Sequence, residues 1–255
     1  MSRGLLSIAL VMLVGRLAVA SEDARAEEAG DGWSIIKQAI KAKGGRKTLV
    51  KHKGVSWKEE GTYFGMGDGL PYEGEVAFQS PDKFRMTIKG VLGVFTIVFD
   101  GRQGWFRSGD NVVEMKDEQV KEQKHSQYAH GVTSLASLKK KGFKYTVLPV
   151  TKDNAKVGEK AVVGVKVESK GRREITLYFD KKTHLLAKSA VEVFSREAGG
   201  KLVDQEILFD DYKEVDGEQF AHKITINHNG EPFIKSKIVE FKAVESLDGK
   251  LFEKP

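Results

Sequence analysis

The chain contains no cysteine among its 255 residues. This absence excludes a disulfide scaffold, a thiolate metal site, a cysteine nucleophile and the acylated cysteine of a lipoprotein. Proline is scarce, with 5 residues against 27 glycines, a balance that suits many tight turns better than proline-rich linkers. Disordered chains combine low hydrophobicity with high net charge. Here 40% of the residues are apolar and the formal net charge is only +6, so most of the chain is expected to fold.

The chain also lacks an apolar run long enough to span a membrane. The longest run, residues 5–14, is about half of the roughly 20 residues that a spanning helix needs. It follows Arg3 and precedes small residues at 18–20, which have the A-x-A spacing of a signal-peptidase site. We therefore expect residues 1–20 to be a secretory signal peptide that is cleaved after Ala20, rather than a membrane anchor. Residues 21–31 are acidic and unpatterned, and they are expected to form a short disordered leader.

The excess of positive charge is small. Removing residues 1–20 lowers the net charge from +6 to +4, because that segment holds Arg3 and Arg16 and no acidic residue. Proteins that bind nucleic acid concentrate their basic residues on one face. The longest basic cluster, residues 139–141, ends a helix-like stretch, where cations complement the helix dipole. No nucleic-acid partner is predicted.

Alternation of apolar and polar residues dominates the chain after a first short helix. Trp33, Ile36 and Ile40 have helical spacing and are followed by Gly44-Gly45. Alternation with a period of two then indicates strands with one buried and one solvent-exposed face, as in an antiparallel sheet. These strands are expected at about 55–63, 72–79, 83–89, 91–99, 163–167, 175–179, 184–194, 203–212, 219–228 and 231–242. We predict a mainly β (α+β) fold with few helices, in which residues 32–255 form a single domain built on one large curved sheet, an open half-barrel.

Two segments depart from simple alternation. The strand at 91–99 is apolar on both sides, so each face must be covered by protein or touched by a ligand. A helical insertion between strands carries an apolar stripe that is expected to pack over the apolar face of the sheet. Gly131 is expected to divide this insertion into two helices, the second ending at Gly142. The stripe consists of Val120, Tyr128, Val132, Leu135 and Leu138.

No motif for catalysis or metal binding is found. The glycine-rich loop at 65–69 lacks the following helix that a dinucleotide site needs. The six histidines do not have ligand spacing with an acidic partner, and they are interpreted as surface residues. Glu59 lies in phase with Trp57 and Tyr63 on the apolar face, either buried with a basic partner or at a strand end. We predict no catalytic residue, no metal site and no cofactor.

Several segments, in this order, resemble one known family. Residues 74–86 match the G-x-x-x-x-x-x-P-x-x-F-x-[WM] strand pair of the LolA/LolB-like superfamily, which includes the outer membrane lipoprotein-sorting proteins. Residues 97–101 and Trp105 resemble its D-G-x-x-x-W hairpin. Further similarity lies at 178–186, 211–217 and 251–255. The likeness runs from about Trp33 to the end of the sequence.

This resemblance implies an open β half-barrel with a helical lid, an apolar cavity for acyl chains and a place in the periplasm. In the lipoprotein carrier an arginine just before the motif proline holds the lid, and Ser80 stands at that position here. A serine cannot supply the charged, forked donor set of an arginine. The resemblance therefore implies the fold more directly than the carrier mechanism.

The hypothesis that follows is a periplasmic, non-enzymatic protein that binds or carries a lipid, a lipoprotein acyl chain or another hydrophobic ligand. Other envelope proteins are possible partners, and no transmembrane span is expected in the mature form. The alternative is an envelope sensor or interaction domain with a filled core, and an unrecognised hydrolase is a third class. The candidate cavity residues are Trp57, Tyr63, Tyr72, Val76, Phe78, Phe84, Met86, Ile88, Phe95 and Ile97.

Overall fold

The computed structural model describes residues 31–195 and 197–255, and residues 31–255 form one compact unit. The predicted signal peptide and nearly all of the predicted leader lie outside the described residues. The unit begins with helices α2 (Gly32–Ala42) and α3 (Gly45–Lys51). Strands β1 (Gly54–Tyr63), β2 (Leu70–Gln79), β3 (Lys83–Gly90), β4 (Gly93–Phe99), β5 (Gly104–Ser108) and β6 (Asn111–Glu114) follow.

Helix α4 (Asp117–Thr133) separates this first group of strands from the second. The second group is β7 (Lys144–Val147), β8 (Lys156–Val157), β9 (Lys160–Glu168), β10 (Ile175–Asp180), β11 (Leu186–Ser195), β12 (Lys201–Val215), β13 (Glu218–His228) and β14 (Glu231–Val244). A short 3-10 helix, η1 (Gly249–Phe252), comes last.

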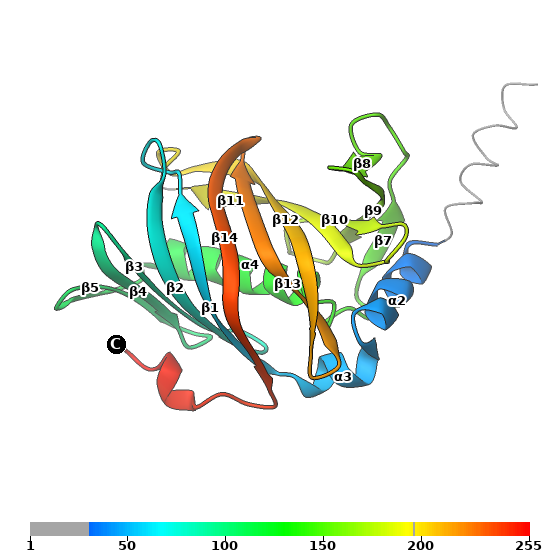
Figure 1. The fold of residues 1–255 in the computed structure, drawn as a ribbon. Helices are drawn as coiled ribbons and strands as arrows, with labels where there is room; N and C mark the ends of the chain where they lie inside the picture. Colours follow the sequence, from blue (N-terminus) through cyan, green and yellow to red (C-terminus); the bar gives the residue numbers. More distant parts are fainter. Residues whose placement is uncertain (1–30, 196) are drawn as a thin grey trace, which may run out of the picture. The chain divides into compact units, whose positions relative to one another are not determined.

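The strands of the described residues form one open sheet of 14 strands, in which the neighbours are antiparallel. Its order is β6-β5-β4-β3-β2-β1-β14-β13-β12-β11-β10-β9-β7, with β8 paired to β9. The two groups of strands meet where β1 pairs with β14, and the end strands β6 and β7 do not pair with each other. Helix α4 lies across one face of this curved sheet, behind β1 and β13 in Figure 1. The predicted fold class, a large curved antiparallel sheet, is confirmed.

The packed core occupies only one part of the concave face. Apolar side chains of β9 and β10 alternate inward, and Val165, Leu177 and Phe179 are at most 1% exposed. They pack against the apolar stripe of α2, in which Ile36 is fully buried, and against the chain that follows α4. The part of the concave face formed by β9 and most of β10 is therefore filled by protein.

The convex face is covered near β3 by the end of the chain. Arg85 Nη1 donates a hydrogen bond to the Leu251 carbonyl at 3.2 Å, and the Phe252 side chain is buried. Val98 and Phe99, which face opposite sides of β4, are both fully buried. The expectation that strand 91–99 is covered on both faces is thus correct at this end of the strand.

The start of the same segment contradicts that expectation. Gly90 pairs with Gly93, so Val91 and Leu92 form the turn between β3 and β4 and are 70% and 53% exposed. Phe95, a predicted cavity residue, is 41% exposed. Composition alone predicts one strand here, because it does not distinguish a hairpin turn from a strand when the turn residues are apolar.

The predicted break in the helical insertion is wrong. Helix α4 continues through Gly131 to Thr133, because one interior glycine costs a helix only about 1 kcal/mol. The hydroxyl groups of Ser134 and Ser137 donate to the Gly131 carbonyl, and no second helix follows before β7 among the described residues. Leu135 lies beyond the helix with a positive φ of 64°, so the predicted stripe does not lie on a single helix face.

Candidate functional site

A cavity of about 770 Å3 lies between helix α4 and the part of the concave face that the core leaves unfilled. This volume is within the range of about 300–1,000 Å3 that small-molecule sites occupy. Strands β1–β3 and β11–β14 supply most of its lining, which is largely apolar. The apolar residues include Trp57, Val76, Phe78, Phe84, Met86, Ile207, Phe209, Ile224, Ile226, Ile234, Ile238 and Phe241.

Half of the predicted cavity residues line this space. Trp57, Val76, Phe78, Phe84 and Met86 do so, because β1, β2 and β3 pair in a register that places them side by side on the concave face. Tyr63, Tyr72, Ile88, Phe95 and Ile97 do not line it.

The predicted aromatic residues that do not line the cavity have other contacts or are exposed. Tyr63 packs edge-on against Phe233, and its hydroxyl donates to Glu197 at 2.9 Å. Tyr72 is buried, with its hydroxyl bonded to Glu59, and Phe95 is exposed near the β3–β4 turn. The alternation identifies the face of the sheet on which these residues lie but not the extent of the cavity along that face.

Only some of the predicted lid residues line the cavity. Tyr128 and Leu135 line the cavity, whereas Val132 and Leu138 are fully buried in the packed core. Val120 is half-buried and does not line the cavity. The segment that covers the cavity is therefore the middle and end of α4 together with the turn that follows it.

The C-terminal strands supply cavity residues that were not singled out from the sequence. Ile224 and Ile226 could have been found, since they alternate with exposed Lys223 and with Thr225. Ile238 and Phe241 could not, because they are three residues apart and simple alternation places them on opposite faces. A β-bulge opposite Lys58 and Glu59 shifts the register and brings both side chains to the cavity.

A buried polar cluster is set into this apolar wall. Glu59 is 7% exposed and lines the cavity. Trp57 Nε1 donates to Glu59 Oε2 at 2.8 Å, and the Tyr72 hydroxyl donates to Oε1 at 2.8 Å. The Ser236 hydroxyl lies 3.5 Å from Oε2. Burial, and then the Glu59 charge, raise the pKa of Tyr72, so its hydroxyl stays protonated as a donor.

A second polar cluster joins the residues on either side of α3 to the β12–β13 turn and the start of β13. His52 lies between two carboxylates, with Nδ1 3.0 Å from Glu218 Oε2 and Nε2 2.8 Å from Asp216 Oδ2. Lys43 Nζ lies 3.2 Å from Glu218 Oε1 and 4.9 Å above the Phe220 ring. Burial lowers the pKa of Lys43 against the opposing effect of Glu218.

The interpretation of all histidines as surface residues is wrong. His52 and His222 are 8% and 7% exposed, and the His130 ring stacks on Phe78 at a centroid distance of 3.7 Å. Burial, and then the charge of Lys43, lower the pKa of His130 to about 4. In the part of the chain that the structure describes, no group of His, Asp and Glu side chains is arranged to hold a metal ion.

Three contacts hold α4 and its following turn over the cavity. Arg173 forms a forked ion pair with Glu122, with distances of 2.7 and 2.6 Å. The stacked His130 and Phe78 rings connect the helix to β2. On α3, the Arg46 guanidinium donates to the carbonyls of Leu135, Ala136 (2.8 Å) and Leu138. Two arginines thus contact this segment, Arg173 on α4 and Arg46 on the turn that follows it, and neither stands at the position of Ser80.

We expect Arg46→Ala to loosen this cover. The substitution leaves three carbonyls without their charged donor, which should lower the free energy of unfolding by about 2–3 kcal/mol. Hydrogen exchange of the amides in 128–138 should become faster, while that of β9 and β10 should change less. Lys47→Ala, on the exposed side of the same helix, is the matched control. Equal exchange in the two variants would show that Arg46 does not hold the cover.

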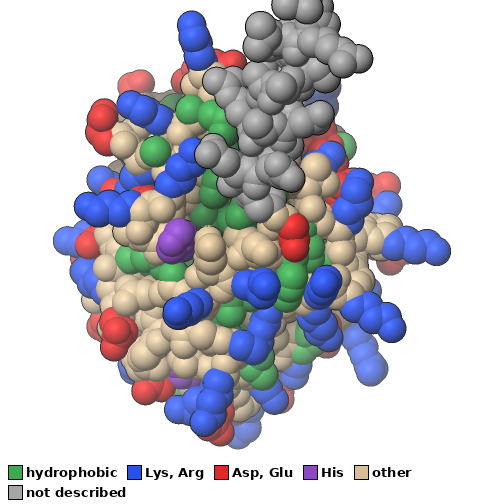
Figure 2. Space-filling view, turned by 90° about the vertical axis from the view of Figure 1, so that its right-hand side faces the viewer, with side chains coloured by type: hydrophobic (Ala, Val, Ile, Leu, Met, Phe, Trp, Pro, Cys, Tyr) green, Lys and Arg blue, Asp and Glu red, His purple; other side chains and the backbone are tan. Residues whose placement is uncertain are grey.

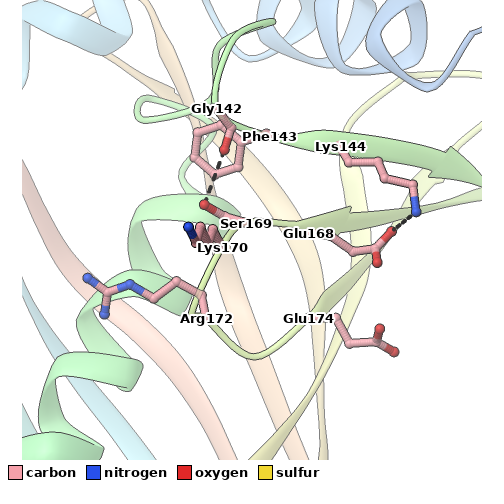
Figure 3. Close-up of a pocket in the computed structure, with 8 residues that line it drawn as sticks. All are labelled: Gly142, Phe143, Lys144, Glu168, Ser169, Lys170, Arg172 and Glu174. Carbon is pink, nitrogen blue, oxygen red and sulfur yellow. Dashed lines mark hydrogen bonds and ion pairs between the residues drawn. The ribbon is translucent and has the colours of Figure 1, made fainter.

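A second hollow lies near β7 and β9 and differs from the cavity in character. It is an open surface depression beside Phe143 and Lys144 (Figure 3). Lys144 Nζ pairs with Glu168 at 3.0 Å, and the Ser169 hydroxyl donates to the Gly142 carbonyl at 3.1 Å. Glu174 pairs outside the hollow with Lys166 at 3.3 Å, and Arg172 lies over the Tyr128 ring. We assign no ligand to this hollow.

The side of the molecule that carries β7, β9 and α2 has Lys and Arg side chains spread over it, with acidic side chains between them (Figure 2). Charges distributed in this way keep a surface hydrated. No helix in the described residues is long and apolar enough to cross a membrane.

Comparisons with known proteins identify the class of fold. No family model matches the sequence, and no curated protein matches it. Three solved structures are similar along most of the chain, and each likeness covers 88% of it. The first is a LolA superfamily protein from Nitrosomonas europaea, with 12% identity, a TM-score of 0.55 and 98% of that chain covered.

The second is a domain assigned to the outer membrane lipoprotein-sorting proteins, from Vibrio parahaemolyticus, with 10% identity, a TM-score of 0.53 and 98% of that chain covered. The third is a DUF1329 family protein from Desulfovibrio piger, with 10% identity, a TM-score of 0.51 and 97% of that chain covered. At these identities the likeness shows the fold alone. The chain therefore has the LolA-like fold that its sequence motifs imply.

Proposed function

We propose that this protein binds a hydrophobic ligand, either a lipid or the acyl chain of a lipoprotein, in the cavity beneath α4, and that it acts as a periplasmic carrier without catalysing a reaction. The observation that carries the proposal is the cavity of about 770 Å3 between an apolar concave face and a helical cover. The LolA-like fold supports the proposal, and the signal peptide predicted at residues 1–20 supports the periplasmic location.

The driving force would be the burial of alkyl chain against the side chains of the concave face. Each buried methylene contributes about 0.8 kcal/mol, and part of this gain offsets the lost freedom of the ligand. A chain of about a dozen methylenes would thus have a net favourable binding free energy of several kcal/mol. The strength of this contribution depends on the length of the apolar chain.

The division of the concave face favours a binding protein over a filled-core sensor. The core packs against β9–β11, whereas the cavity lies against β1–β3 and the inner faces of β11–β14. A filled half-barrel would instead place bulky side chains on both parts.

Mass spectrometry of the protein purified from its native envelope would test the proposal. We expect an apolar molecule to co-purify with the chain and to be released by organic extraction. Ile226→Trp should fill the cavity and abolish this recovery without lowering the melting temperature. Lys223→Trp, which points away from the cavity on the same strand, should retain the ligand. An empty wild-type protein that also fails to take up a neutral alkyl probe would refute the proposal.

A further inference from the structure

The polar cluster at Glu59 has an unusual charge balance for the wall of an apolar cavity. The carboxylate accepts hydrogen bonds from Trp57 and Tyr72 and lies near the Ser236 hydroxyl, and all three donors are neutral. Within the described part of the chain, Glu59 forms no ion pair with a lysine, arginine or histidine. Buried carboxylates are normally paired with a cation, because the removal of a charge from water is costly.

The two strands are shaped to hold this carboxylate. In the pairing of β1 with β2, Glu59 faces Gly74 and Gly61 faces Tyr72. A Cβ atom on Gly74 would lie 2.8 Å from Glu59 Cγ, and one on Gly61 would lie 2.6 Å from the Tyr72 ring. Each of the two buried polar side chains thus lies over a glycine. The β-bulge opposite Lys58 and Glu59 adds a local change of register at the same point.

We propose that Glu59 is a specificity residue of the cavity, and that it selects ligands carrying a protonated amine on an apolar chain. This inference rests on the proposed function, since it names the headgroup chemistry of the same cavity. A carboxylate has about four acceptor positions, and the two short hydrogen bonds and the longer Ser236 contact leave one of them free. An ammonium group at that position would supply both the missing donor and the missing charge.

The other charges that line the cavity do not favour an anionic ligand instead. Lys43 is already paired with Glu218 and lies over the Phe220 ring. Arg173 is bound on two sides by Glu122. These two cations have their own carboxylates, and Lys53, the third lysine or arginine of the lining, is exposed to solvent, which screens its charge. Glu59, in contrast, is buried and has only neutral partners. A fatty-acid carboxylate placed beside Glu59 would meet a like charge in a site of low dielectric constant, which is strongly unfavourable.

Competition among three probes of equal chain length would test this inference. Dodecylamine, dodecanol and dodecanoate would each displace a neutral pyrene-labelled alkane from the wild-type protein at neutral pH. We expect dodecylamine to bind about tenfold or more tightly than dodecanol, and dodecanoate to bind most weakly, because charge-assisted hydrogen bonds are about twice as strong as neutral ones.

Glu59→Gln keeps the shape of the side chain and removes the charge. It should abolish the preference for dodecylamine and leave dodecanol binding within about threefold of wild type. Tyr72→Phe, which removes a donor from Glu59 but keeps its charge, should retain the preference and serves as the second variant if Glu59→Gln does not fold. Equal affinities of the amine and the alcohol in wild type, or an unchanged preference in Glu59→Gln, would overturn the inference.

These outcomes are distinct from failure of the proposed function. If the pyrene-labelled alkane itself does not bind to the wild-type protein, the cavity is not a lipid site and both proposals fail. If the alkane binds and all three competitors displace it with equal affinity, the cavity function stands and the role of Glu59 does not.

Discussion

A carboxylate placed at Met86 is expected to abolish the uptake of a neutral fluorescent acyl probe. Met86 lies on β3 and lines the cavity, so Met86→Glu would place an unpaired charge where the alkyl chain is proposed to lie. The desolvation of that charge should cost about 3 kcal/mol of binding free energy, which corresponds to an affinity loss of about 100-fold. Because the side chain is only half-buried, the charge can be hydrated in the empty cavity, and stability should fall by about 1 kcal/mol or less.

Two controls separate the charge from other effects of the substitution. Met86→Leu keeps an apolar side chain of similar volume and should bind the probe as wild type does. Thr225→Glu introduces the same charge on the opposite face of the sheet and should leave the probe affinity unchanged. Titrations of the probe and thermal melts on the same samples give both quantities. If Met86→Glu collapses the melting temperature while the wild type binds no probe, Met86 belongs to a packed core and the filled-barrel sensor is favoured.

Mild acid is expected to weaken the attachment of α4 to the sheet. The pKa of His130 is lowered to about 4 in the folded protein, against an ordinary value of about 6.5. The folded state thus favours the neutral ring, and its contribution to stability is fully present above pH 6.5. That contribution is lost as the pH falls from 6.5 through 4, because the unfolded or opened state takes up the proton first. The full loss is about 3 kcal/mol, at about 1.4 kcal/mol per pKa unit.

Chemical denaturation between pH 7 and pH 4 would measure this effect. His130→Phe keeps a flat ring on Phe78 but cannot be protonated, so its stability should fall less steeply with acid than that of the wild type. Burial also lowers the pKa of His125 and of His228, so His125→Phe is the matched control for a general histidine effect. A wild-type profile that is parallel to that of His130→Phe would show that the stacked ring does not carry the pH dependence.

The strands and their inward faces could be predicted from the sequence because apolar and polar residues alternate along a strand that has one buried face. Trp57, Val76 and Met86 were identified in this way, and the register confirms that they lie side by side. The carboxylate of Glu59 was also placed on the apolar face by the same period. The alternation could not predict the hydrogen-bond partners of Glu59. Tyr72 and Ser236 lie on other strands, so their positions depend on how the strands pair.

Other features depend on contacts that leave no local pattern. Arg46 is an ordinary cation on a short helix, and only the folded chain brings it to the carbonyls that follow α4. The bulge that turns both Ile238 and Phe241 inward breaks the very alternation that predicts inward residues. The helix that runs through Gly131 shows that a single glycine is a weak stop signal when its neighbours favour the helix.

The division of the concave face into a packed part and an open part separates two kinds of evolutionary constraint. Substitutions among the buried residues of β9 and β10 act mainly on whether the chain folds, because most of these side chains belong to the packed core. Substitutions along the open stretch of β1–β3 act mainly on which molecule is accepted, because the space there can absorb changes of volume. The residues of the packed part can therefore stay nearly constant in descendants of this chain while those of the open part change. New ligand specificities can then arise without a new fold.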